Sequence, residues 1–153
     1  MSRDLPAGIA LPSRFRVGAY GLLVEDGRIL ITKTRTRTGV LLNFPGGAVE
    51  LGEGALEALR REFVEETGLS VRATHLAHAS EAFFQSRDYP ENQLIKLYWV
   101  VERDGGELLV GGNGDDVVGC LWSPLETLEE LGLTRSDLEA VRAMRERGLL
   151  PRR

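Results

Sequence analysis

The stretch that decides the fold is Gly47–Leu69, with the sequence GAVELGEGALEALRREFVEETGL. Its central part, Ala55 to Thr67, is rich in good helix formers and stops at Gly68, a residue suited to the left-handed conformation that ends many helices. At about 100° per residue, one side of this helix is apolar and predicts the face that packs on a core. The side chains on that side are Leu56, Leu59 and Phe63.

Three glutamates of the same helix, Glu62, Glu65 and Glu66, are spaced i, i+3 and i+4, so their carboxylates converge beside the apolar side. Converging like charges repel one another and need compensation. Hard divalent cations supply it, because Mg²⁺ prefers carboxylate, water and phosphate oxygens and, in pairs, assists attack on phosphorus. The alternative is a solvated acidic face that is neutralised by i, i+4 pairs of Arg61 with Glu57 and Glu65.

The complete pattern of the stretch favours the metal-binding interpretation. Its fixed positions are Gly47, Glu53, Arg61-Glu62, Glu65-Glu66 and Gly68, with apolar residues after Glu62 and after Gly68. This pattern resembles the Nudix box at every defined position, a match expected by chance with a probability on the order of 10⁻⁷. The order of elements around it is also similar to a Nudix domain, so the resemblance extends over most of the chain.

The resemblance to the Nudix hydrolase family implies a metal-binding loop, helix and loop with Mg²⁺ or Mn²⁺ as cofactor. The implied metal ligands are Glu62, Glu65, Glu66 and the backbone carbonyl of Gly47. Arg61 is implied to hold the loop by pairing with Glu53, and Glu53 to join the metal shell through water or to act as a base. The implied reaction is hydrolysis of a phosphoanhydride bond in a nucleoside triphosphate, a nucleotide sugar such as ADP-ribose, or a dinucleoside polyphosphate.

The general base is left open by the sequence. Some members of the family use a glutamate six residues before an aromatic residue that begins a late strand, and here Trp122 marks that strand while Asp116 takes the matching place. Aspartate is shorter than glutamate, so Glu65 and Glu66 stay alternative bases. A simple polar turn at Asp115-Asp116 is the structural alternative.

The fold class implied by the resemblance and by the mixture of elements is α+β, a Nudix fold with a mixed β-sheet sandwiched between helices. Asp26-Gly27 predicts a tight hairpin between strands Phe15–Val24 and Arg28–Thr36. Pro45-Gly46-Gly47 and Asp104-Gly105-Gly106 predict turns.

The remaining predicted elements surround a polar loop, Gln85–Asn92. They are short strand Val40–Phe44, strands Val71–Phe84, Gln93–Glu102 and Val117–Ser123, a short helix Pro124–Leu131, and a terminal helix Thr134–Arg147 with Thr134 and Asp137 as a capping pair. Within Gln93–Glu102 an apolar alternation predicts a packed side; its members are Ile95, Leu97, Trp99 and Val101.

Cationic side chains on the second strand are candidates for phosphate binding. Lys33, Arg35 and Arg37 alternate with threonines and therefore share one face. This face can hold phosphate oxygens opposite the metals, with Arg35 and Arg37 favoured because they are closer to the box. A solvated edge strand defended by charge is the alternative.

Aromatic residues near the polar loop are candidates for stacking on a nucleobase: Phe83, Phe84 and Tyr89. Simple core packing is the alternative. Related enzymes that cut ADP-ribose or diadenosine polyphosphates carry a proline or a tyrosine at a set distance after the box. Phe84–Arg87 occupies that distance here and contains neither, so neither substrate class is assigned.

Length and composition predict one domain over residues 1–153, with residues 1–13 as an extended N-terminal arm. The net charge of −4 lacks the basic surplus typical of nucleic-acid-binding proteins, and no apolar run approaches the length of a membrane span. A hydrophobic signal region is absent from the start, so a cytoplasmic location is expected. The expected partner is a small-molecule nucleotide, and a homodimer is compatible with the resemblance.

Two alternative functions share the fold. A non-catalytic nucleotide-binding sensor would keep the domain, but such proteins often have degraded boxes, whereas this box is intact. An isomerase of isoprenoid diphosphates uses a catalytic cysteine. The single cysteine, Cys120, lies in the apolar run Val117–Trp122, which predicts a buried strand and an inert core thiol.

Overall fold

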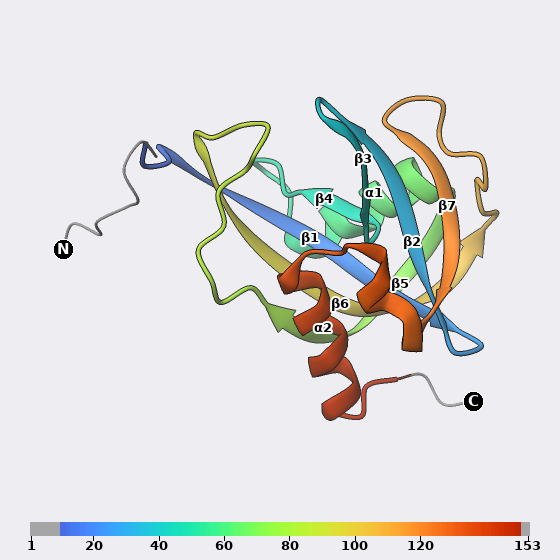
Figure 1. Cartoon of the computed structure of the whole chain (residues 1–153). Helices are drawn as coiled ribbons and strands as arrows, with labels where there is room; N and C mark the ends of the chain where they lie inside the picture. Colours follow the sequence, from blue (N-terminus) through green and yellow to red (C-terminus); the bar gives the residue numbers. More distant parts are fainter. Residues whose placement is uncertain (1–9, 151–153) are drawn as a thin grey trace.

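The computed structural model describes residues 10–150, so most of the predicted arm, residues 1–13, lies outside the described part of the chain. A twisted sheet separates two helices, α1 (Ala55–Thr67) on one side and α2 (Arg135–Glu146) on the other (Figure 1). This arrangement confirms the predicted α+β class with a mixed sheet between helices.

Seven strands form the sheet in the order β3-β2-β1-β6-β5, with β4 paired to β1 and β7 paired to β2. Their bounds are β1 Arg14–Glu25, β2 Arg28–Thr36, β3 Gly39–Asn43, β4 Gly46–Ala48, β5 Leu69–Ala79, β6 Asn92–Gly106 and β7 Val117–Pro124, followed by the 3₁₀ helix η1, Leu125–Leu131. The sheet is mixed because β1 and β6 are parallel whereas the other pairs are antiparallel.

Two local predictions are confirmed in detail. Asp26 and Gly27 both have positive φ, 52° and 72°, as the tight hairpin between β1 and β2 requires. At the start of α2 the Thr134 hydroxyl accepts from the Asp137 N–H at 3.2 Å, and the Asp137 carboxylate accepts from the Thr134 N–H at 3.3 Å.

Both predicted glycine turns are wrong, since each segment joins the sheet. Gly46 and Gly47 belong to β4, where Gly46 approaches β1 so closely that a Cβ would lie 2.1 Å from the Ala19 carbonyl oxygen. Gly105 and Gly106 continue β6 and pair with the start of β5. Glycine is required for close backbone packing at positions 46 and 106, since a Cβ on Gly106 would likewise lie 2.1 Å from the Gly68 carbonyl oxygen.

The predicted strand Val71–Phe84 is too long at its end, because β5 stops at Ala79. The Ser80 N–H still bonds to the Lys96 carbonyl at 2.8 Å, after which the chain leaves the sheet. The segment returns near Phe84, whose carbonyl accepts from the Leu94 N–H at 2.8 Å. A long connection therefore lies against the start of β6, and it is the yellow-green loop in Figure 1.

The sheet buries one hydrophobic core on each side. The core under α2 includes Leu22, Phe44, Tyr98, Ala140 and Met144, and the core under α1 includes Leu23, Leu59, Phe63, Val101 and Cys120. Leu59 and Phe63 are buried as predicted, but Leu56 is 45% exposed. The buried sector of α1 also contains Ala58 and Glu66, so it is turned toward the carboxylates and leaves Leu56 at its edge.

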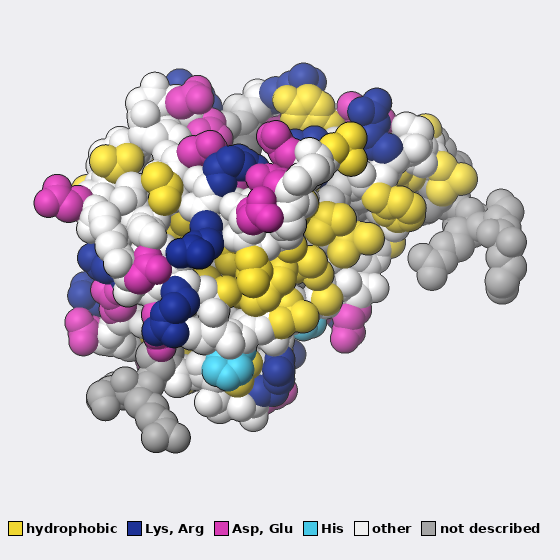
Figure 2. Space-filling model, turned by 180° about the vertical axis from the view of Figure 1, so that it is seen from behind, with side chains coloured by type: hydrophobic (Ala, Val, Ile, Leu, Met, Phe, Trp, Pro, Cys, Tyr) yellow, Lys and Arg dark blue, Asp and Glu magenta, His cyan; other side chains and the backbone are white. Residues whose placement is uncertain are grey.

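The predicted apolar side of β6 is packed in part. Val101 is buried in the core under α1 and half-buried Trp99 packs against it, whereas Ile95 and Leu97 are only half-buried. Tyr98 and Val100, on the other face, lie in the core under α2. Figure 2 shows an extended hydrophobic area on the side of the molecule turned away in Figure 1.

Within residues 10–150, no helix combines the length and apolar character needed to cross a membrane.

Candidate active site

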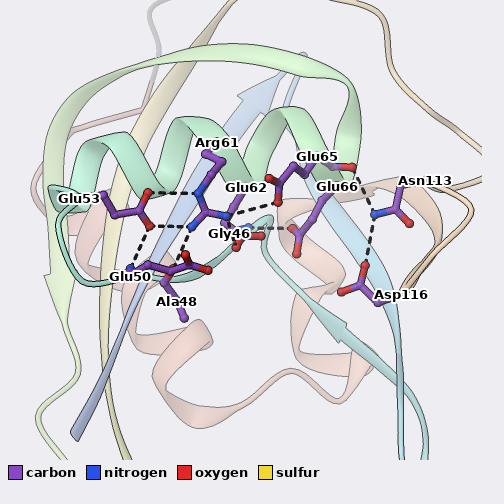
Figure 3. Close-up of polar contacts among 10 residues, drawn as sticks. All are labelled: Gly46, Ala48, Glu50, Glu53, Arg61, Glu62, Glu65, Glu66, Asn113 and Asp116. Carbon is purple, nitrogen blue, oxygen red and sulfur yellow. Dashed lines mark hydrogen bonds and ion pairs between the residues drawn. The ribbon is translucent and has the colours of Figure 1, made fainter.

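A pocket of about 400 Å³ lies between the second half of α1 and the loop before β7. All of its lining residues are polar, and they are Glu62, Glu65, Glu66, Asn113, Asp115 and Asp116. Figure 3 shows the three glutamates on successive turns of α1, with Glu62 and Glu65 beside Arg61 and Glu66 beside Gly46. The helix thus brings together the carboxylates that the sequence predicted as a group.

Glu66 is the buried member of this group, with only 7% of its surface exposed. Its Oε2 accepts a hydrogen bond from the Gly46 N–H at 2.9 Å. Burial raises the pKa of Glu66 to about 8, and the nearby charges of Glu62 and Asp116 add to the rise. A buried carboxyl group surrounded by other carboxylates is an environment that a bound cation would stabilise.

Glycine at position 47 lets the backbone approach Glu62. A Cβ on Gly47 would lie 2.6 Å from the Glu62 carboxyl carbon and 2.8 and 2.9 Å from its two oxygens. Any larger residue would therefore displace the carboxylate. Burial also raises the pKa of Glu62, although hydrogen bonding to Arg61 opposes the change.

Arg61 connects the helix to the loop that precedes it (Figure 3). Its Nη2 and Nε donate to the two Glu53 oxygens at 2.6 and 3.1 Å, and Nη2 also donates to the Ala48 carbonyl at 3.2 Å. Its Nη1 donates to Glu62 at 2.9 Å and to Glu65 at 3.3 Å. Planar, forked hydrogen bonding of this kind is specific to arginine and fixes the loop against α1.

Glu53 is held on both carboxylate oxygens. Besides the Arg61 contacts, its Oε1 accepts from the Glu50 N–H at 2.9 Å. The hydrogen bonds from Arg61 and Glu50 lower the pKa of Glu53 below its usual value. The geometry therefore favours Glu53 as a partner that holds Arg61 over Glu53 as a proton acceptor.

The alternative interpretation, an acidic face neutralised by pairs of Arg61 with Glu57 and Glu65, is present only in part. Arg61 pairs with Glu65 as that alternative requires, but turns to Glu53 and not to Glu57. One guanidinium shared by Glu53, Glu62 and Glu65 leaves Glu66 without a cationic partner among the ion pairs within residues 10–150. Across the same residues, no three acidic, histidine or cysteine side chains already surround one point as metal ligands do. Glu62 and Glu65 are turned toward Arg61, whereas Glu66 is turned toward Gly46.

The loop before β7 is fixed to the end of α1 by Asn113, which the sequence interpretation missed. The Asn113 amide donates to the Glu65 carbonyl and to Asp116 Oδ1, both at 3.2 Å. The Arg35 N–H also bonds to the Asp116 carbonyl at 2.8 Å. Asp116 therefore stands at the carboxylate pocket, beside Arg35 of β2. Asn113 was hidden in the glycine-rich run Gly111–Gly114, which indicates only a flexible loop.

The cations of β2 share an exposed face, as predicted, but β2 is not an edge strand. It pairs with β3 on one side and with β7 on the other. The edge-strand alternative is therefore wrong. Arg37, just beyond β2, lies 4.6 Å from the centre of the Tyr89 ring and donates to the Asp88 carbonyl at 3.3 Å.

A second hollow, of about 440 Å³, lies along β1 and the start of β6, under the loop that contains Tyr89. A neighbouring hollow of about 260 Å³ includes Phe84 and shares Tyr20 and Lys96 with the first. We call the two together the β1–β6 cleft. The structure thus places Phe84 and Tyr89 at this cleft, whereas Phe83 lines neither hollow and is 41% exposed.

Tyr20 and Lys96 were missed as site residues. The signal for Lys96 was present in the sequence, because it has the same parity on β6 as Tyr98 and Val100 and so occupies a core-facing position. A lysine at such a position is uncommon and calls for a functional or structural reason. Nothing in the sequence marked Tyr20 as a site residue, since aromatic residues are common in β-strands.

Cys120 lies on β7 and is buried, 8% exposed, in the core under α1. Burial raises the pKa of its thiol to about 11, with a contribution from the charge of Glu66. The thiol is therefore protonated and poorly nucleophilic at neutral pH, as expected for an inert core cysteine. The sequence feature that supported an isomerase offers no reactive group here.

Solved structures with similar architecture identify the fold of this protein. A NUDIX hydrolase from Nitrosomonas europaea superposes with a TM-score of 0.74 at 17% identity, covering 92% of this chain and 98% of that chain. A MutT NUDIX hydrolase from Burkholderia pseudomallei superposes with a TM-score of 0.71 at 24% identity, covering 85% of this chain and 98% of that chain. The fold is thus that of a Nudix hydrolase.

Sequence comparison identifies the family. The family model of the NUDIX domain matches residues 12–144. An ADP-ribose pyrophosphatase of Methanocaldococcus jannaschii is 32% identical over 116 residues, which cover 75% of this chain and 65% of the relative. An 8-oxo-dGTP diphosphatase of Escherichia coli is 31% identical over 106 residues, which cover 60% of this chain and 78% of the relative. The chain belongs to the Nudix family, and it spans slightly less than two thirds of the first of these relatives.

Proposed function

We propose that this protein is a metal-dependent pyrophosphohydrolase that cleaves a phosphoanhydride bond in a substrate built on a nucleoside diphosphate. The observation that carries the proposal is the carboxylate pocket, where Glu62, Glu65 and Glu66 face one hollow beside the Gly47 backbone. The family membership and the names of two relatives, a pyrophosphatase and a diphosphatase, support the same reaction class.

The residues of the pocket fit a hard divalent cation. The carboxylate side chains of the pocket offer only oxygen atoms as metal ligands. Glu66 is buried without a cationic partner among residues 10–150. Because Gly47 has no Cβ, its peptide lies beside the Glu62 carboxylate. The ligands would be Glu62, Glu65, Glu66 and the Gly47 carbonyl. When bound, Mg²⁺ or Mn²⁺ neutralises phosphate charge and makes a water molecule more acidic.

The remaining residues of the site would position the substrate and accept a proton. Arg61 and Glu53 hold the loop of Gly47 against α1 by their paired hydrogen bonds. Asp116 accepts a hydrogen bond from Asn113 through Oδ1 alone, which leaves Oδ2 available to a water molecule at the pocket. Glu65, which is exposed at the same pocket, is the alternative base.

Phosphate and base contacts complete the proposal. The backbone of Arg35 lies beside that of Asp116, and its side chain would contact phosphate oxygens. Arg37 contacts Tyr89 of the β1–β6 cleft and would bind phosphate from that side. Phe84 and Tyr89 would contact the base, and Phe83 is less favoured because it lines neither hollow of the cleft. The domain would span residues 1–153 and act on a small nucleotide, and a homodimer stays a prediction.

The test is an assay of the purified protein with Mg²⁺ or Mn²⁺ and a panel of nucleoside triphosphates, oxidised nucleotides, nucleotide sugars, ADP-ribose and dinucleoside polyphosphates. Products are separated by chromatography. Glu65→Gln and Glu66→Gln remove one carboxylate each, and Glu57→Gln is the matched control because it lies on the same helix, exposed and outside the pocket.

We expect metal-dependent release of a nucleotide, a loss of about 10³-fold in kcat for Glu66→Gln, and an unchanged rate for Glu57→Gln. The best substrate in the panel identifies the leaving group. Full activity in both Glu65→Gln and Glu66→Gln would contradict the proposal. Tight nucleotide binding without turnover under every metal condition would instead indicate the non-catalytic sensor.

A further inference from the structure

Lys96 is a charged residue at a core-facing position of β6, and only 8% of it is exposed. The neighbouring positions on the same face, Tyr98 and Val100, are packed in the core under α2. Burial of an ammonium group is unfavourable unless hydrogen bonds and counter-charges compensate it. The partners of Lys96 therefore indicate what this position is for.

The contacts of the ammonium group within residues 10–150 include no hydrogen bond, and Nζ keeps contact with the solvent of the cleft. Its Nζ lies 3.9 Å from Asp137 Oδ1, which is too long for a hydrogen bond. The rings of Phe84 and Tyr20 lie 4.9 and 5.6 Å from Nζ and provide cation–π contacts only. Among residues 10–150, no atom accepts a hydrogen bond from Nζ. Since Lys96 lines both hollows of the β1–β6 cleft, its donors are directed at whatever occupies that cleft.

Asp137 forms an ion pair with Lys96 and accepts a hydrogen bond on each carboxylate oxygen. Its Oδ1 accepts from the Tyr98 hydroxyl at 2.6 Å, and its Oδ2 accepts from the Thr134 N–H at 3.3 Å. Asp137 lines the smaller hollow but is only 2% exposed, and the Lys96 ammonium lines both hollows, so Asp137 acts as a positioning residue for Lys96.

The cleft and the carboxylate pocket both adjoin the pairing of β1 with β4. Tyr20, whose ring contacts Lys96, stands opposite Gly46 in the pairing of these strands, and the Gly46 N–H bonds to Glu66. A nucleotide with its phosphates at α1 can therefore extend its base toward Tyr20, Phe84 and Lys96. The larger hollow, about 440 Å³, has the size of a small-molecule site.

We propose that Lys96 selects the base, so that the cleft takes a nucleotide whose purine carries a 6-oxo group in preference to an adenine nucleotide. An ammonium group has three donors and no acceptor. A 6-oxopurine presents a carbonyl acceptor at the edge where adenine presents an amino donor. The Lys96 ammonium donates a hydrogen bond to the 6-oxo carbonyl. It forms no such bond with the 6-amino group of adenine, because both groups are donors. The inference rests on the proposed function only in placing the phosphates at α1.

The experiment compares inosine and adenosine nucleotides, which differ only at the 6-position edge of the purine. Calorimetry measures the binding of IMP and AMP without metal, independently of turnover. The proteins are the full chain, Lys96→Met, Lys96→Arg, and Arg72→Met as a control that removes an exposed cation of β5 away from the cleft. Thermal unfolding verifies that each variant is folded.

We expect the native protein and Arg72→Met to bind IMP about 10- to 100-fold more tightly than AMP, the range of a hydrogen bond from a charged donor. Lys96→Met should abolish this preference, and Lys96→Arg, which keeps the donors, should retain most of it. Equal binding of IMP and AMP by the native protein, no binding of either, or a preference that survives in folded Lys96→Met would overturn the proposal. If Lys96→Met does not fold, the native comparison and Lys96→Gln, which should lose most of the preference, decide it.

A parallel assay of ITP and ATP with Mg²⁺ separates this inference from the proposed function. Preferential binding of IMP without hydrolysis of either triphosphate or of the wider panel would contradict the hydrolase and leave the base preference intact. Hydrolysis of both at equal kcat/KM, with equal binding of the monophosphates, would contradict the base preference and leave the hydrolase intact.

Discussion

The carboxylate pocket and the β1–β6 cleft are built in opposite ways. The pocket takes its glutamates from successive turns of α1 and adds one loop, Gly111–Asp116. The cleft is assembled from β1, the end of β2, β3, β4 and β6, the loop between β5 and β6, and the start of α2. The pocket gathers negative charge around one arginine, whereas the cleft presents one buried ammonium group between aromatic rings. The difference suggests a division between chemistry on α1 and recognition across the sheet.

The proposed separation of chemistry on α1 from recognition across the sheet is tested most directly at Asp116, which lines the carboxylate pocket but lies outside α1. If Asp116 is the general base, Asp116→Asn should lower kcat by about 10²-fold with little change in KM, because a positioned proton acceptor contributes at least that much. Steady-state kinetics on the best substrate of the panel checks it.

The matched control for this prediction is Asp115→Asn, an equal change at the neighbouring residue of the same pocket. Its carboxylate is expected to matter less, because the backbone N–H of Asp115 and not its side chain takes part in the Asn113 hydrogen bonds. A loss in Asp115→Asn as large as in Asp116→Asn would mean that the pocket needs negative charge in general. An unchanged kcat in Asp116→Asn would return the base role to Glu65 or Glu66.

A smaller effect is expected at Arg61, whose role is to position the loop. Arg61→Lys keeps the charge but loses the fork that spans Glu53, Ala48 and Glu62. We expect kcat to fall by about 10-fold, as for other partners of ligand residues, with the inosine-to-adenosine preference unchanged. Arg60→Lys, which alters an exposed pair with Asp104, is the control. A changed base preference in Arg61→Lys would show that the two regions are not separate.

The parts of the molecule that the sequence predicted are those determined by neighbouring residues. α1, its glycine cap, the Asp26-Gly27 hairpin and the α2 capping box each depend on a few consecutive positions. The carboxylate group follows from helical periodicity, which is a local property. The Arg61–Glu53 pair was implied by the family pattern and is present in the structure.

The parts that the sequence did not predict depend on contacts between distant segments. Gly46 and Gly47 form β4 only because β1 lies against them, so their turn propensity was overridden. The Lys96 environment requires Phe84 and Asp137, which come from a loop and a helix elsewhere in the chain. Asn113 acquires its role only when its loop meets the end of α1. Local patterns do not contain such partners, although the parity of Lys96 gave a partial signal.

The central claim is that the α1 carboxylates hold the cation on which hydrolysis depends, and direct Mn²⁺ binding tests it. Electron paramagnetic resonance measures free Mn²⁺ during titration of the native protein, Glu66→Gln and Glu57→Gln, without any nucleotide. The account predicts saturable binding to the native protein and to Glu57→Gln, and an affinity at least about 10-fold weaker in Glu66→Gln. Equal Mn²⁺ affinity in all three proteins would contradict it.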